Sequence, residues 1–263
     1  MDLASIGIFD SGVGGLTVLK ALREALPGES FIYLGDTARL PYGSKSPRTI
    51  RKYLAQNVEF LRARGVKAVV VACNTASTEL DEAAWPGLAI YGVIRPGAEA
   101  AVMATHNGKI GVLATRTTVQ SAAYQTALKL LNPKVDVIQQ ACPLLVPLVE
   151  EGWEDEAVTR EVVARYLEAP LAHGADTLIL GCTHYPVLKA VIQARAGSGI
   201  ALIDSAQVMA HKIASDLNEG KIEPPTGRPG TDIWTTDLSE VFQQVGRRIL
   251  APFPANSWQL ADI

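Results

Sequence analysis

Cysteine is scarce in this chain, and its copies lie far apart. Cys73, Cys142 and Cys182 are odd in number and include no CxxC pair. Disulfide frameworks and structural zinc sites are typically built from an even number of cysteines or from closely spaced ones. The sequence therefore predicts free thiols and no metal site.

Long charged runs, low-complexity tracts and long apolar segments are also missing. Of the 263 residues 48% are hydrophobic and 19% charged, and the formal net charge is −3 with Lys and Arg scattered. Without a basic patch, nucleic acid is not an expected partner. The longest apolar runs, such as 68–73, have the length of a strand and do not suggest a membrane span. Residues 1–5 carry no cationic targeting region, so we expect a cytoplasmic protein.

Short aliphatic runs alternate with amphipathic segments along the chain. Apolar residues spaced by three or four positions predict a helix over residues 49–64. This alternation favours an α/β fold of mainly parallel sheets covered by helices, with ligands bound beyond the carboxyl ends of the strands. The predicted buried strands are residues 6–9, 31–34, 68–72, 110–113, 178–180 and 201–203.

The chain repeats itself faintly. Residues 6–9 resemble residues 110–113, and residues 65–73 resemble residues 174–182, both segments ending in Cys. Each half thus opens with a strand and later presents a helix, a Gly and a strand that ends in Cys. We expect two pseudo-symmetric lobes with an active site in the cleft between them.

The C-terminal part adds a further unit. Residues 224–230 are rich in Pro and Gly and predict a linker or long loop. A strand over 233–236 and a helix over 238–250 are expected to pack back onto the first lobe. The expected lobes are therefore residues 1–95 with 208–263, and residues 96–207.

Cys73 and Cys182 hold matching positions in the two halves. Each follows a buried strand and precedes polar residues suited to the start of a helix. A free cysteine is most often a small core hydrophobe, and we keep that interpretation for Cys142. Equivalent placement in two related halves, beside polar neighbours, instead indicates a functional role for the other two thiols.

Two like groups on opposing lobes suit the inversion of a stereocentre. One group removes the proton from one face of the carbon, and the other delivers a proton to the opposite face. An unperturbed thiol has a pKa of about 8.5, so modest tuning is enough to keep one as thiolate and one as thiol near neutral pH. Cys73 and Cys182 are thus predicted to act as an acid/base pair.

A glycine-rich turn follows the first strand, over residues 9–17. Its backbone amides could hold an anion, whether phosphate or carboxylate. Asp36, roughly 20 residues further on, suits a dinucleotide site, but the spacing is GxGG and Thr17 replaces the last small residue of that fingerprint. No Gly-Lys-Ser/Thr P-loop is present either. A nucleotide site and a purely structural turn remain alternatives.

Three further polar positions are notable. The loop 36–43 is stiffened by Pro41, and its Tyr42 is able to shape a pocket. His184 lies two residues beyond Cys182, where it could bind substrate or tune the thiol. Zinc binding by these two residues lacks a second ligand pair. By periodicity alone, Glu150 is an acidic residue on the solvated face at a helix end.

Several segments, in order along the chain, resemble the glutamate racemases of the cofactor-independent aspartate/glutamate racemase superfamily. Each is short, and the ordered set is what makes the resemblance specific. The segments are IFDSGVGGLT (8–17), GDTARLPYG (35–43), ACNTA (72–76), IGVLAT (110–115), LVE (148–150) and GCTHYP (181–186).

The resemblance implies two lobes related by pseudo-twofold symmetry that interconvert L- and D-glutamate for peptidoglycan synthesis, with no cofactor. It implies Cys73 and Cys182 as the two bases, and Asp10, Glu150 and His184 as residues that assist proton transfer. The implied substrate-binding residues are Asp10, Ser11, Tyr42, Gly43, Asn74, Thr75, Thr183 and His184.

Some features depart from this pattern. Arg95 stands where the family more often has an acidic residue, and the segment after Gly220 matches poorly. Both a monomer and a homodimer are compatible with the sequence. Alternative functions are racemisation of aspartate or a hydantoin, decarboxylation, or non-catalytic ligand binding; two cysteines argue against a one-thiol decarboxylase.

Overall fold

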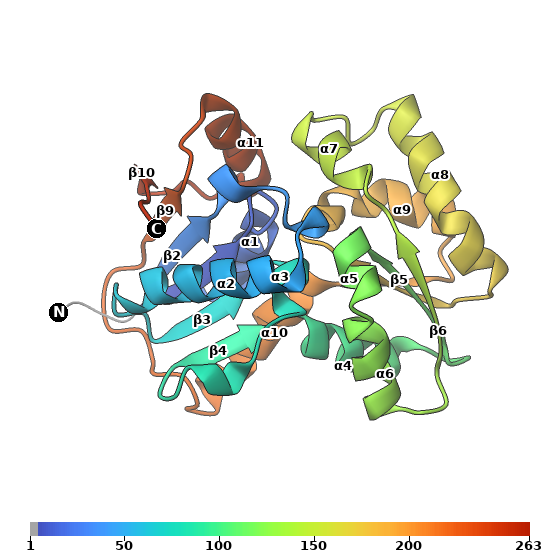
Figure 1. Cartoon of the computed structure of the whole chain (residues 1–263), viewed down its shortest axis with the longest axis horizontal. Helices are drawn as coiled ribbons and strands as arrows, with labels where there is room; N and C mark the ends of the chain where they lie inside the picture. The colour runs from blue at the N-terminus through green and yellow to red at the C-terminus, as the bar shows by residue number, and fades with distance from the viewer. Residues whose placement is uncertain (1–4) are drawn as a thin grey trace.

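The computed structural model describes residues 5–263 and contains two parallel sheets (Figure 1). One sheet has six strands in the order β10-β9-β2-β1-β3-β4, and the other has four in the order β6-β5-β7-β8. The predicted α/β class with parallel, helix-covered sheets is confirmed. The interpretation of residues 1–5 as free of a targeting region falls mostly on residues 1–4, outside the described range.

The central strands are buried along their whole length, which explains their continuous apolar runs. The six-stranded sheet contains β1 (Ile6–Asp10), β2 (Phe31–Gly35), β3 (Ala68–Val71), β4 (Ala89–Gly92), β9 (Thr231–Thr235) and β10 (Ser257–Leu260). The four-stranded sheet contains β5 (Lys109–Ala114), β6 (Asp136–Ala141), β7 (Thr177–Gly181) and β8 (Ala201–Asp204).

Three strands were not predicted: β4, β6 and β10. Each lies at the edge of its sheet and is only partly buried. An edge strand needs no unbroken apolar run, and β6, with the sequence DVIQQA, has none. The C-terminal strand β9 pairs with β2, so the chain returns to the six-stranded sheet after the irregular segment 224–230, as expected.

Helices cover both faces of both sheets (Figure 1). The helix predicted over 49–64 begins at Pro47, because Ser46 caps it by accepting a hydrogen bond from the Thr49 amide at 3.3 Å. The helices are α1 (Leu16–Ala25), α2 (Pro47–Arg62), α3 (Asn74–Ser77), α4 (Ile94–Ala104), α5 (Arg116–Gln120), α6 (Ala123–Leu131), α7 (Leu145–Glu150), α8 (Ala157–Ala172), α9 (Lys189–Ala196), α10 (Ser205–Asn218) and α11 (Glu240–Leu250).

Each sheet therefore has two apolar layers. In the larger sheet, Ile6 and Ile8 face the layer beneath α1, α10 and α11, whereas Phe9 faces the layer beneath α2, because side chains alternate along a strand. Helix α10 packs against both α1 and α4 and so links the two lobes. No helix within residues 5–263 is long and apolar enough to cross a membrane.

Candidate active site

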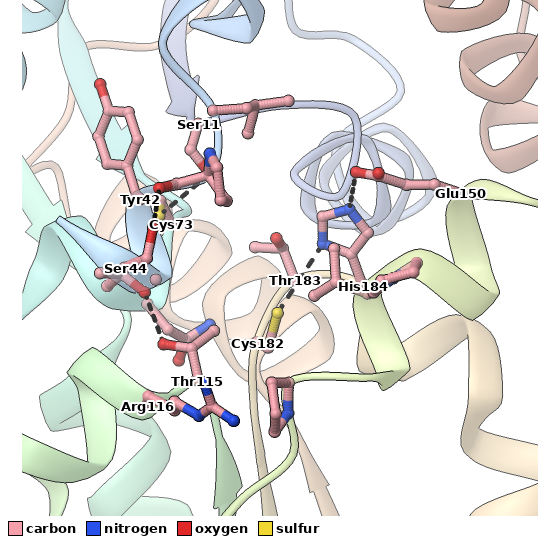
Figure 2. A pocket seen from close by; sticks show the side chains of 18 residues that line it. Ser11, Tyr42, Ser44, Cys73, Thr115, Arg116, Glu150, Cys182, Thr183 and His184 are labelled. Atoms are coloured by element: carbon pink, nitrogen blue, oxygen red, sulfur yellow. Dashed lines mark hydrogen bonds and ion pairs between the residues drawn. The ribbon is translucent and has the colours of Figure 1, made fainter. Parts of the chain in front are cut away.

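A cavity of about 360 Å³ lies between the two lobes (Figure 2). It is lined by both thiols that the sequence singled out, and by all the other predicted site residues except Asp10. The lining residues are Ser11, Leu40, Pro41, Tyr42, Gly43, Ser44, Cys73, Asn74, Thr75, Thr115, Arg116, Pro143, Val146, Pro147, Glu150, Cys182, Thr183 and His184.

The two thiols enter this cavity from different sheets. Cys73 follows β3 and caps α3, where its sulfur accepts a hydrogen bond from the Ala76 amide at 3.4 Å. Cys182 follows β7 of the smaller sheet. The residues are 5% and 6% exposed, and this small exposed surface faces the cavity. Parallel strands thus deliver one thiol from each lobe to the carboxyl ends of the sheets.

The thiol of Cys73 is strongly perturbed. Its burial and the nearby charge of Asp10 raise its pKa to about 12, against a smaller opposing effect of hydrogen bonds with Ser11 and Ala76. The sulfur lies 3.5 Å from the Ser11 hydroxyl, to which it donates. Cys73 is therefore a protonated thiol at neutral pH, and its shift is larger than the modest tuning that the sequence argument required.

Cys182 belongs to a chain of proton-binding groups. Its sulfur lies 3.8 Å from Nδ1 of His184, and Nε2 of that ring lies 3.1 Å from Oε1 of Glu150. Burial of the ring disfavours its charged form, but hydrogen bonds to Cys182 and Glu150 outweigh burial and raise the pKa of His184 to about 10. An imidazolium therefore lies between the sulfur of Cys182 and the carboxylate of Glu150 at neutral pH.

Glu150 occupies the last position of α7, as its periodicity indicated, but its carboxylate is turned toward His184 (Figure 2). Its side chain is 37% exposed, which leaves it in contact with both the cavity and solvent. The periodicity of one helix carries no information about a partner on another segment. The contact with His184 is thus a tertiary feature.

Asp10 lies behind the cavity wall, fully buried at the end of β1. Its carboxylate accepts hydrogen bonds from the Gly12 amide at 2.9 Å and from the Thr183 hydroxyl at 3.2 Å. Burial raises the pKa of Asp10, and the charge of His184 opposes that shift. Asp10 is therefore placed to influence groups of both lobes without lining the cavity.

The glycines of the turn after β1 allow close packing. A Cβ on Gly14 would lie 2.4 Å from Nδ1 of His184, and a Cβ on Gly15 would lie 2.3 Å from the Cβ of Asp10. Ser11 lines the cavity, whereas these glycines contact polar groups behind it. This geometry favours the structural interpretation of the turn over a nucleotide site.

The loop after β2 forms one wall of the cavity through Tyr42 and Gly43. The Tyr42 hydroxyl donates to the carboxylate of Asp36, which also accepts from Arg39 at 2.7 Å and from Asn57 at 3.2 Å. Burial and the Asp36 charge raise the pKa of Tyr42 well above its ordinary value. Asp36 therefore anchors the loop, and it is not available to a ribose.

Asn74 and Thr75 connect the two lobes at the cavity wall. The Tyr124 hydroxyl donates to Oδ1 of Asn74 at 2.6 Å, and the Thr75 hydroxyl lies 3.0 Å from that of Thr115 and 3.1 Å from that of Thr118. The amide nitrogen of Asn74 is buried and has no hydrogen-bond partner within residues 5–263. It is a donor free to bind a carboxylate oxygen.

Several lining residues were missed from the sequence. Thr115 follows β5 just as Ser11 follows β1, so the internal repeat could have identified it. Arg116 is exposed at the start of α5, and no sequence signal pointed to it. The others are Leu40, Pro41, Ser44, Pro143, Val146 and Pro147. No cluster of three or more His, Cys, Asp or Glu side chains suited to a metal occurs within residues 5–263.

The fold and the cavity define a two-lobed α/β enzyme with a pair of cysteines in its cleft. The model of the Asp/Glu/Hydantoin racemase family matches residues 6–213. The chain belongs to this family and is an amino-acid racemase, that is, an isomerase. The alternative of a non-catalytic binding protein is therefore not retained.

The similarity to known proteins covers nearly the whole chain. A glutamate racemase from Geobacter metallireducens is 48% identical over 253 residues, which cover 95% of this chain and 94% of that protein. The crystal structure of a glutamate racemase isoform from Bacillus anthracis has a TM-score of 0.92 at 38% identity, covering 99% of this chain and 98% of that one. Glutamate racemase from Francisella tularensis, in complex with D-glutamate, has a TM-score of 0.91 at 34% identity, covering 100% and 98%.

Proposed function

We propose that this racemase interconverts L-glutamate and D-glutamate. The curated relative from Geobacter metallireducens carries that activity in its name, and the similar structure from Francisella tularensis was solved with D-glutamate. The cavity offers groups that fit an amino acid with two carboxylates. Asn74 supplies a buried free amide donor, Arg116 a guanidinium and His184 an imidazolium.

One observation carries the two-base mechanism: Cys73 and Cys182 face a single cavity from opposite lobes (Figure 2). Inversion requires a base on one face of the α-carbon and an acid on the other. The two thiols have different surroundings. Burial and the charge of Asp10 raise the pKa of Cys73, whereas Cys182 is hydrogen-bonded to the imidazolium of His184.

The proton balance follows from these surroundings. In the proposed step Cys182 reacts as a thiolate beside the imidazolium of His184, and it removes the α-proton. Cys73 is the thiol, and it gives its proton to the opposite face of the resulting carbanion. The electron pair of the broken C–H bond forms the new one, and the two sulfurs exchange protonation states. The reverse reaction restores them.

The remaining predicted site residues bind and orient the substrate in this proposal. Hydroxyl and amide donors hold the two carboxylates, while Glu150 and Asp10 assist through His184 and Thr183. The lining residues assigned to substrate are Ser11, Tyr42, Gly43, Asn74, Thr75, Thr183 and His184. We also assign residues 1–95 with 208–263 to the first lobe and 96–207 to the second, which agrees with sheet membership.

Racemisation and α-proton exchange test the proposal directly. The purified protein, given L-glutamate without pyridoxal phosphate, should lose optical rotation and incorporate α-deuterium in deuterated water. Aspartate serves as the rival substrate in the same assay. If aspartate is racemised and glutamate is not, the substrate assignment is wrong.

Serine variants test the two thiols. Cys73→Ser and Cys182→Ser should each lose roughly 10²- to 10⁴-fold in rate, as expected when a general acid or base is removed. Cys142→Ser is the matched control, because this third buried thiol lies outside the cavity lining. Full activity in either cleft variant would exclude the two-base mechanism.

The cellular role follows from the product. We propose that the enzyme acts in the cytoplasm to supply D-glutamate for peptidoglycan. Expression in a bacterium that requires D-glutamate for growth should remove the requirement, and the Cys73→Ser variant should not. If the wild type and the Cys73→Ser variant support growth without D-glutamate equally well, this role is contradicted.

A further inference from the structure

Arg248 reaches across the cleft at a distance from the cavity itself. It lies near the end of α11 in the first lobe, and in Figure 1 this helix stands opposite α7 of the second lobe. Its Nη2 donates to the carbonyl oxygen of Val149 at 2.7 Å and lies 3.0 Å from Oε1 of Glu154. Val149 directly precedes Glu150, so this hydrogen bond holds the C-terminal end of α7, which carries the Glu150 carboxylate.

The turn after α7 is fitted to this guanidinium. Gly152 has a φ of +77°, and a Cβ there would lie 2.4 Å from Nη1 of Arg248. Both the backbone conformation and the space therefore favour glycine at this position. A cation that binds a terminal carbonyl also complements the charge at the C-terminal end of a helix.

We propose that Arg248 is a positioning residue that holds Glu150 against His184 when the two lobes come together. This inference rests on the proposed racemase function, in which His184 supports the thiolate of Cys182. Helix α7 spans only Leu145–Glu150, and its first turn has no side-chain cap. A contact from the opposite lobe thus determines where its last residue lies.

The geometry links lobe closure to proton transfer. When the lobes separate, the hydrogen bond from Arg248 to Val149 at the end of α7 breaks, and Glu150 is then free to leave His184 for solvent. Arginine is suited to this task because Nη2 carries two N–H groups, so this one nitrogen meets both the Val149 carbonyl and Glu154.

The experiment compares Arg248→Ala with Arg247→Ala in the full chain. Arg247 is the matched control, because it is the neighbouring cation on the same helix and its partners are Gln243 and the ring of Trp258. Displacement of a catalytic group by a remote change can cost up to about 100-fold. We expect a loss of roughly ten-fold in kcat for Arg248→Ala with little change in KM, and wild-type values for the control.

The pH profile separates positioning from a general loss of stability. The titratable groups that face His184 are Cys182, Glu150 and Asp10, and only the placement of Glu150 depends on Arg248. The alkaline limb of kcat/KM should therefore move to lower pH in Arg248→Ala. Arg248→Lys keeps the positive charge and N–H donors on a shorter side chain without the planar guanidinium, so it should recover part of the lost rate.

A double variant makes the inference specific. Arg248→Ala and Glu150→Gln act through one contact, so their combined effect on kcat should be smaller than the product of the two single effects. Fully multiplicative effects would overturn the inference, as would an unchanged rate and pH profile in a folded Arg248→Ala protein. If that variant does not fold, a wild-type rate and pH profile in Arg248→Met, which keeps much of the side chain's bulk but no donor, would overturn the inference equally. A wild-type enzyme inactive on glutamate would instead refute the proposed function.

Discussion

Replacement of Glu150 by glutamine removes one negative charge beside His184 and changes little else. In the unsubstituted protein, Nε2 of His184 lies 3.1 Å from Oε1 of Glu150. Glutamine keeps the size of the side chain and an oxygen that can accept the same hydrogen bond. The imidazolium loses the charge of one of the two groups that raise its pKa to about 10. The pKa of His184 should therefore fall.

The size of this effect follows from the distance and the exposure. Two unit charges separated by 3.1 Å attract by about 1.3 kcal/mol in water and by about 5 kcal/mol at an effective dielectric constant of about 20. Because the Glu150 side chain is 37% exposed, screening by solvent favours the lower end, about 1.5 kcal/mol. That energy corresponds to about one pH unit.

The assay is the pH dependence of racemisation, followed by circular dichroism with L-glutamate. The imidazolium is lost as the pH rises through the pKa of His184, and the support for the Cys182 thiolate is lost with it. In Glu150→Gln the alkaline limb of kcat/KM should lie about one pH unit lower, and kcat should fall roughly ten-fold, a modest loss among acid–base effects.

Glu151→Gln provides the control, because it removes the same charge from the next residue, which is exposed. It should leave both the rate and the alkaline limb unchanged. An alkaline limb that stays in place in Glu150→Gln, with the rate either kept or lost, would refute the coupling between Glu150 and His184. An equal shift in Glu151→Gln would show that only long-range charge matters.

Two further predictions concern packing and pH. Gly14→Ala places a methyl group 2.4 Å from Nδ1 of His184, so it should lower the free energy of unfolding by about 1–3 kcal/mol and reduce activity. Urea titration and rate measurements check this. Gly28→Ala is the control, because a methyl group there meets open space. The pKa of His184 rises from an ordinary value of 6.5 to about 10, so the contribution of its charged form to stability is complete below pH 6.5 and disappears as the pH rises through about 10. The melting temperature should therefore fall over that window. The fall should be smaller in His184→Asn.

The central strands and the two cleft thiols were predictable from the sequence. A strand buried on both faces must be apolar throughout, so β1, β3 and β7 appear as unbroken runs, and the residues after them fall at the ligand-binding edge of the sheet. Cys73 and Cys182 follow two of these runs. Their position was therefore a local property of the chain.

The edge strands and part of the cavity were not predictable in this way. β6 is half-exposed and carries polar residues, so it has no continuous apolar pattern. Arg116 lines the cavity because α5 begins at the cleft, and nothing in its sequence neighbourhood indicates that. Contacts between lobes join residues that are far apart in the chain, and local patterns do not encode them.

The sequence by itself determined the class of fold, the strand-end positions of the thiols and the resemblance to a racemase family, because each depends on short apolar runs and on motifs read in order. Only the tertiary structure decided which groups meet. It set Glu150 against His184, fitted Gly14 to that ring and brought Arg248 to the end of α7. It also raised the pKa of Cys73, because burial beside a charge depends on what surrounds a thiol in space.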